Sequence, residues 1–81
     1  MPTVLRWGAY RAFFYSNEGD EPAHIHVDRA DCSAKFWLDP VALARSVGFP
    51  AHELRVVQTL VAQQRAEFLE KWHGYFGVGG R

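Results

Sequence analysis

Two histidines separated by one residue, His24 and His26, have the types and spacing most suited to chemistry in this sequence. On a β-strand, residues two apart point to the same side of the sheet. Imidazole titrates near neutral pH, so such a pair can act as general acid and general base. The pair could equally supply two metal ligands, with Asp20, Glu21 or Asp28 as a third.

A structural role is the third interpretation of the two histidines. In that case His24 hydrogen-bonds the 17–23 loop and His26 fills a position at the rim of the sheet. Cys32 is a poor third metal ligand, because strand alternation places it on the core side. The sequence has no Gly-rich phosphate loop and no His-Glu-x-x-His motif. The pattern alone therefore leaves acid–base chemistry, metal binding and a structural role open.

Strands must position these histidines, and four segments of the first half have the composition of strands. They are Thr3–Trp7, Tyr10–Ser16, His24–Arg29 and Cys32–Leu38. Only two residues separate the first two segments, and only two separate the last two, which predicts two hairpins. The polar stretch 17–23 reads as a loop. Residues 41–45 are either a short fifth strand or irregular, and residues 46–49 read as a turn.

From Pro50 to about Tyr75 the sequence predicts one helix with an apolar stripe. Pro suits a first helical turn, and Glu53 complements the positive end of the helix dipole. We therefore expect an α+β fold: an antiparallel sheet of four or five strands with one long C-terminal helix packed on one face. A single domain over residues 1–76 and a flexible tail over residues 77–81 complete the prediction.

Strand alternation predicts what the two faces of this sheet carry. If Ala30 and Asp31 form a two-residue turn, Val27 pairs with Ala34 and Ile25 with Phe36, on an apolar face that meets the helix. The opposite face gathers basic and aromatic side chains, with Asp28 as its acid. They are Arg6, Arg11, Phe13, Tyr15, His24, His26, Lys35 and Trp37, together with Val4 and Ser33. Cations interleaved with aromatic rings suit single-stranded nucleic acid.

Composition excludes several classes of protein. The 81 residues are 48% hydrophobic and 15% aromatic, which favours one compact domain over disorder. One cysteine cannot form an intramolecular disulfide. No apolar run reaches the roughly 18 residues of a membrane span, and the N-terminal residues do not read as a signal peptide. We therefore expect a cytoplasmic protein that does not bind membranes. The formal charge of zero gives no signal for nucleic acid by itself.

Four segments of the chain resemble the small bacterial proteins of the domain-of-unknown-function 4160 family. They are Thr3 to Arg6, Phe13 to Asn17, Glu21 to Val27 and Ala34 to Leu38. The block Glu-Pro-Ala-His-Ile-His-Val is the most specific of them. The family usually has a second Pro where this chain has Ala23, and often a Ser or Asn helix cap where this chain has Pro50 and Ala51. Neither departure removes a candidate functional group.

The resemblance implies a partner protein, because family members are commonly encoded beside a small protein in what looks like a type II toxin–antitoxin operon. This family is the suspected toxin of that pair. By analogy with other small toxins, it implies an activity directed at RNA.

Our leading hypothesis is a toxin that acts as a metal-independent endoribonuclease without a cofactor. One of His24 and His26 would take the 2′-hydroxyl proton and the other would protonate the leaving oxygen. Arg11 and Lys35, with Arg6, would stabilise the charge of the phosphorane. The rings of Tyr15 and Trp37 would stack on bases.

Two other classes of function stay open. One is a non-catalytic module that binds a cognate antitoxin protein, with the aromatic and Arg side chains as anchors. The other is a metal-binding protein that uses the His-x-His pair. The sequence leaves the RNA target, the identity of the partner and the oligomeric state open.

Overall fold

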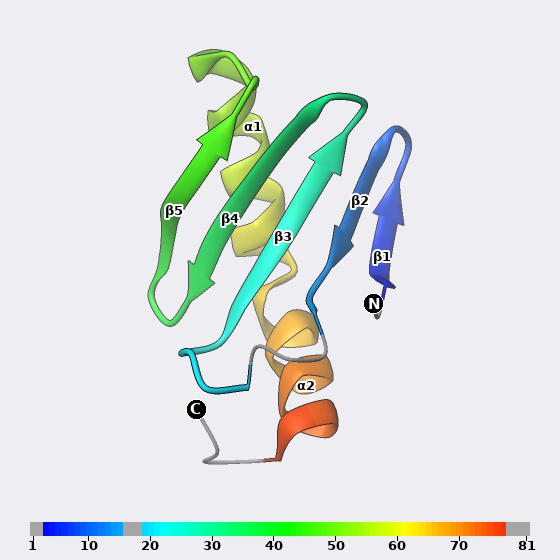
Figure 1. The fold of residues 1–81 in the computed structure, drawn as a ribbon, viewed down its shortest axis with the longest axis vertical. Helices are drawn as coiled ribbons and strands as arrows, with labels where there is room; N and C mark the ends of the chain where they lie inside the picture. Colours follow the sequence, from blue (N-terminus) through cyan, green and yellow to red (C-terminus); the bar gives the residue numbers. More distant parts are fainter. Residues whose placement is uncertain (1–2, 16–18, 78–81) are drawn as a thin grey trace.

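A computed structural model describes residues 3–15 and 19–77 of this chain. Five antiparallel strands form one sheet, in which the order of the strands follows the order of the chain (Figure 1). The strands are β1 (Thr3–Trp7), β2 (Tyr10–Phe13), β3 (His24–Arg29), β4 (Cys32–Leu38) and β5 (Val41–Val47). The sheet thus has the predicted antiparallel form, with the fifth strand present.

The central hairpin of β3 and β4 has the predicted register. Val27 pairs with Ala34, and Ile25 pairs with Phe36. All four side chains are buried, as expected for the face that meets the helices. Ala30, in the turn, has a φ of 51°, the left-handed conformation that tight hairpin turns require.

The first hairpin differs from the prediction at both of its ends. A register shift between Thr3 and Leu5 leaves Val4 packed against the core, so its predicted place on the opposite face is wrong. Strand β2 ends at Phe13, and Phe14 is buried in the core. The end of the predicted strand, at Ser16, lies outside the described residues.

Strand β5 is longer than the sequence indicated, because it continues through Ser46 and Val47, where a turn was predicted. Its pairing with β4 contains one irregularity. Phe36 pairs with Leu43, whereas the adjacent Lys35 pairs with Arg45. One residue of β5 is therefore left over, which is the signature of a β-bulge.

Two helices follow the sheet, α1 (Ala51–Gln63) and α2 (Arg65–Phe76), so the prediction of one long helix is wrong. The interruption coincides with a polar anchor. Arg65 donates from Nε to the carbonyl oxygen of Leu38 at 2.6 Å and from Nη2 to Asp39 at 3.0 Å. These bonds tie the first residue of α2 to the end of β4, and α2 then continues past the end of the sheet (Figure 1).

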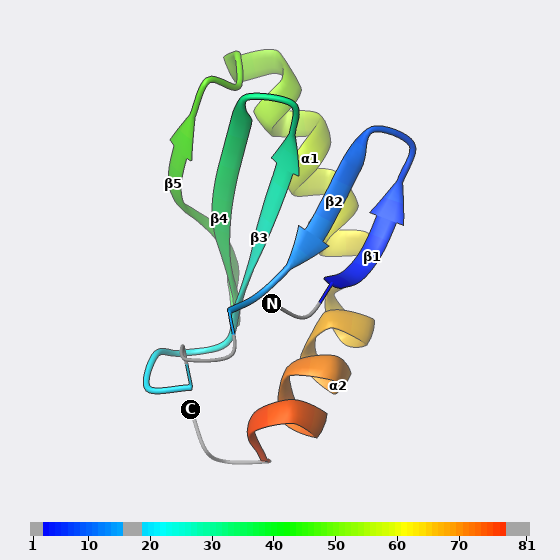
Figure 2. The same cartoon turned by 45° about the vertical axis from the view of Figure 1, so that its right-hand side comes forward.

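Both helices lie on the same side of the sheet, and the core lies between the two layers (Figure 2). Val57 and Val61 of α1 and Phe68 and Trp72 of α2 are buried there, with exposed fractions of 1% or less. Tyr75, near the end of the predicted helix, is 53% exposed. No described helix is both long and apolar enough to cross a membrane. Apart from Gly77, the predicted tail lies outside the described residues.

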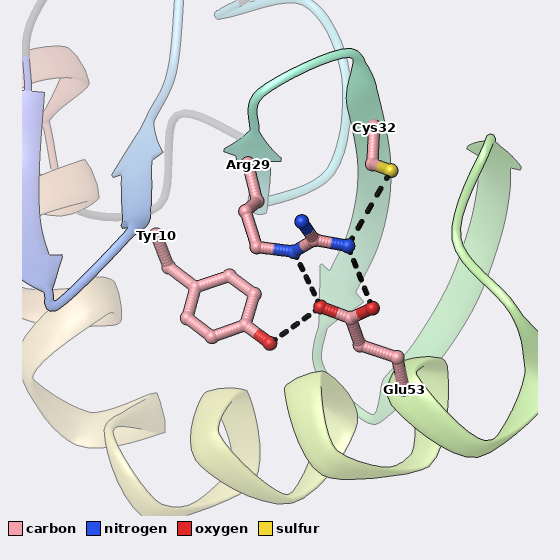
Figure 3. A network of polar contacts seen from close by, with 4 residues as sticks. All are labelled: Tyr10, Arg29, Cys32 and Glu53. Carbon is pink, nitrogen blue, oxygen red and sulfur yellow. Dashed lines mark hydrogen bonds and ion pairs between the residues drawn. The ribbon is translucent and has the colours of Figure 1, made fainter.

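A polar network joins the start of α1 to the sheet (Figure 3). Glu53 accepts bonds from Nε and Nη2 of Arg29 and, at 2.7 Å, from the hydroxyl of Tyr10. The hydrogen bond from Arg29, and then that from Tyr10, hold the pKa of Glu53 below its ordinary value. The hydrogen bond between Tyr10 and Glu53 also raises the pKa of the Tyr10 hydroxyl. The network fixes α1 across the strands, as a bidentate charged pair does.

Candidate nucleic-acid interface

The face of the sheet turned away from α1 and α2 carries the predicted site residues, and we call it the outer face. In Figure 2 no described helix lies over this face, although Trp72 of α2 contacts its His24 end. The pairing of the strands assigns its members, which are Arg6, Arg11, Phe13, His24, His26, Asp28, Ser33, Lys35, Trp37, Arg45 and Val47. Tyr15, just after β2, packs against two of these side chains, Phe13 and His26.

The strand registers order the outer face into rows that cross the sheet. In the middle row, Phe13 pairs with His26, His26 with Lys35, and Lys35 with Arg45. Directly opposed side chains in an antiparallel sheet lie within contact distance of each other. The middle row therefore places an imidazole and two cations side by side on three adjacent strands.

His24 is brought close to His26 but is not accessible. Its exposed fraction is 0%, and its ring lies 4.8 Å from that of Trp72 in α2 and 5.2 Å from that of His26, centroid to centroid. Its Nδ1 lies 2.9 Å from the carbonyl oxygen of Pro22. A carbonyl oxygen only accepts, so this contact requires the proton on Nδ1. This position matches the loop contact that the structural interpretation predicted for His24.

His26 is the partly exposed member of the pair. Its ring stacks on Phe13 at 5.3 Å and meets the edge of Tyr15 at 4.9 Å. Phe13 is buried, with an exposed fraction of 2%, whereas Tyr15 is 42% exposed. The aromatic neighbours thus hold the imidazole of His26 in place and leave one ring, Tyr15, at the surface.

The predicted cations of the outer face are present, and two of them face an acid. Nζ of Lys35 lies 2.6 Å from the carboxylate of Glu21 and 4.6 Å from the centre of the Trp37 ring. The guanidinium of Arg11 lies 3.9 Å from the carboxylate of Asp28 and also covers Phe13 at 4.5 Å. The positive potential of these two side chains is therefore partly neutralised.

Arg6 and Arg45 complete the basic character of the outer face at its two edge strands. Arg6 pairs with Arg11 and is exposed, and Arg45 pairs with Lys35 and is exposed. Neither makes an ion pair with another described residue. The structure thus brings together all seven residues predicted from the sequence, although His24 is buried among them.

The sequence analysis missed Arg45 as a site residue. Without a bulge, the pairing of Leu43 with Phe36 would continue so that Arg45 opposed Ala34 on the core face. The extra residue in β5 turns Arg45 to the outer face, opposite Lys35. Bulges re-aim side chains in this way and are common beside functional sites. A basic residue in an otherwise apolar candidate strand was the one signal available.

The metal-binding interpretation finds no ligand set among the described residues. No group of three or more His, Cys, Asp or Glu side chains lies close enough together there to hold a metal ion. The carboxylate of Glu21 lies 3.7 Å from Nδ1 of His24, and the ring neighbours of the two histidines include Phe13, Tyr15, Trp37 and Trp72, which are not metal ligands. We therefore derive no function through a metal.

The fold and the outer face define a small α+β protein with a five-stranded meander, two helices on one face and a basic, partly aromatic surface on the other. The chain matches the family described as domain of unknown function (DUF4160) over residues 9–73. It therefore belongs to that family. No curated protein and no solved structure matches the chain.

Proposed function

We propose that this chain is the toxin of a type II toxin–antitoxin pair and that it acts on RNA through the outer face. The observation that carries the RNA part is the middle row, where the partly exposed His26 stands beside Lys35 and Arg45. Cations bind the phosphates of RNA, and an exposed ring such as Tyr15 stacks on a base. The toxin part rests on the resemblance to small bacterial proteins that are encoded beside a partner.

Binding of RNA has more support from the geometry than cleavage by two histidines. An acid–base pair must touch the substrate with both imidazoles, and His24 is fully buried against Trp72. We therefore assign His24 to the support of the site. Its ring holds its place between the loop carbonyl of Pro22 and the ring of His26.

If the chain cleaves RNA, His26 is the base. Its imidazole takes the proton of a 2′-hydroxyl, the 2′-oxygen bonds to phosphorus, and the bond from phosphorus to the 5′-oxygen breaks. The products are a 2′,3′-cyclic phosphate and a 5′-hydroxyl, whose oxygen takes its proton from water. Lys35 and Arg11 stabilise the charge of the phosphorane.

A second candidate function is the non-catalytic module that binds a cognate antitoxin. Two observations favour it. Lys35 and Arg11 already face carboxylates, which weakens their attraction for phosphate. Leu43 and Val47, two large apolar side chains with exposed fractions of 41% and 60%, both lie on the edge strand β5. Exposed apolar side chains on an edge strand are a common contact for another chain.

The test is bacterial growth after induction of this chain alone. We expect arrest with the wild type and growth with His26→Ala at the same soluble level. His52→Ala is the matched control, because His52 is an exposed histidine on α1, and it should arrest growth like the wild type. Arrest by His26→Ala would remove the role of this imidazole. Growth with the soluble wild type would favour the binding module.

A further inference from the structure

The side chains around the bulge of β5 form a small hollow on the outer face. It has a volume of about 20 Å³, and its lining includes His26, Ser33, Lys35, Arg45 and Val47. A polar hollow needs roughly 10–15 Å³ to hold one water. The space therefore fits one oxygen-sized group, with imidazole, hydroxyl and cationic side chains around it.

The side chains around the hollow leave one positive charge without an acidic partner among the described residues, which favours the binding of an anion. Lys35 and Arg45 are directly opposed across β4 and β5, and like charges in that arrangement destabilise a sheet. Glu21 compensates Lys35 at 2.6 Å, and Asp28 faces Arg11. Arg45 makes no ion pair with any other described residue. One positive charge at the rim of the hollow thus stays uncompensated.

The geometry points to a phosphate-binding site at this hollow: we propose that Arg45 binds a phosphate group, one oxygen of which enters the hollow between Ser33 and His26. A guanidinium suits phosphate because its planar fork of donors can bond two oxygens at once. A singly charged phosphodiester matches the single uncompensated charge of Arg45. The bulge is essential to the site, since it alone turns Arg45 to the outer face.

This inference rests on the proposed function for the source of the phosphate, which we take to be the backbone of single-stranded RNA. Free inorganic phosphate offers the same chemistry. The two sources are distinguished by using each as a probe of the intact protein.

The first arm titrates ¹⁵N-labelled protein with inorganic phosphate at constant ionic strength and follows the amide resonances. We expect saturable shifts at Ser33 and at residues 45–47. Arg45→Gln should weaken this binding by about tenfold, as loss of a charged hydrogen-bonding partner does. Arg55→Gln removes an exposed arginine of α1 and should bind phosphate like the wild type. Absence of saturable shifts, or equal binding by both variants, would overturn the site.

The second arm measures the affinity of the same proteins for a labelled single-stranded RNA by fluorescence anisotropy. Competition by phosphate, and a loss of affinity in Arg45→Gln alone, would support the phosphodiester as the natural ligand. RNA binding that is unchanged in Arg45→Gln would overturn the RNA backbone as the ligand of this site and leave the proposed function standing. Phosphate binding without RNA binding would support the site and overturn RNA as its source.

Discussion

Trp72 connects the helical layer to the candidate site, and its replacement tests that connection. The side chain is 0% exposed. Its ring lies 4.4 Å from that of Phe76, 5.3 Å from that of Phe14 and 4.8 Å from that of His24. If α2 packs as described, Trp72→Ala removes a fully buried aromatic side chain and leaves a cavity beneath His24.

The expected loss is about 3–5 kcal/mol of the free energy of unfolding. The free energy of unfolding of a small domain is roughly 0.05–0.15 kcal/mol per residue, which gives about 4–12 kcal/mol for the 81 residues of this chain. Trp72→Ala thus removes a large share of the total stability. At a urea m value of about 1 kcal/mol/M, the loss shifts the unfolding midpoint by about 3–5 M.

Urea unfolding followed by circular dichroism measures this shift. Tyr75→Ala is the matched control, because Tyr75 is an aromatic residue of the same helix that is 53% exposed. It should shift the midpoint by less than about 1 M. Trp72→Phe, which keeps a ring, should lie between the two and keeps the test valid if the Ala variant does not fold. Equal midpoints for Trp72→Ala and Tyr75→Ala would refute the packing of α2.

Three further predictions concern other contacts. The hydrogen bonds that lower the pKa of Glu53 stabilise the fold at pH values above 4.5, the ordinary pKa of a Glu side chain. This stabilisation is lost as the pH falls through the lower pKa that Glu53 has in the folded protein. Glu53→Gln should therefore flatten the acid limb of a stability–pH curve, and an acid limb as steep as that of the wild type would contradict the role of these bonds. Arg65→Ala should cost about 1 kcal/mol in urea unfolding, because two hydrogen bonds are lost from a part-exposed side chain; an unchanged midpoint would contradict the anchoring of α2. His24→Ala should lower stability by roughly 1–3 kcal/mol, more than His26→Ala, because His24 alone is fully buried. The reverse order would contradict its supporting role.

The strands could be predicted because their signals are local. Alternation over six or seven residues and a two-residue turn determine the register of β3 and β4, so the pairs Ile25–Phe36 and Val27–Ala34 were predicted correctly. The same alternation placed His26, Lys35 and Arg11 together on the outer face. These features depend on the two-residue alternation of side chains along a strand, which can be recognised in the sequence itself.

The features that the sequence did not predict depend on contacts between distant segments. The break before Arg65 accompanies its bonds to the end of β4, 27 residues earlier in the chain. The burial of His24 comes from Trp72, on a helix that follows all the strands. The outward turn of Arg45 comes from one unpaired residue in β5, for which the local sequence has no Gly or Pro as a marker. The alternation of residues within one segment does not predict the helix break, the burial of His24 or the outward turn of Arg45.

The central claim is that the outer face, and not the helical side, binds RNA. Two double variants test it directly by fluorescence anisotropy with a single-stranded RNA. Tyr15→Ala with Arg45→Gln removes a ring and a charge from the outer side, and Tyr75→Ala with Arg55→Gln removes the same groups from the helices. We predict that the first loses at least about tenfold in affinity and that the second binds like the wild type. Equal affinities, or a loss confined to the helical variant, would contradict the account.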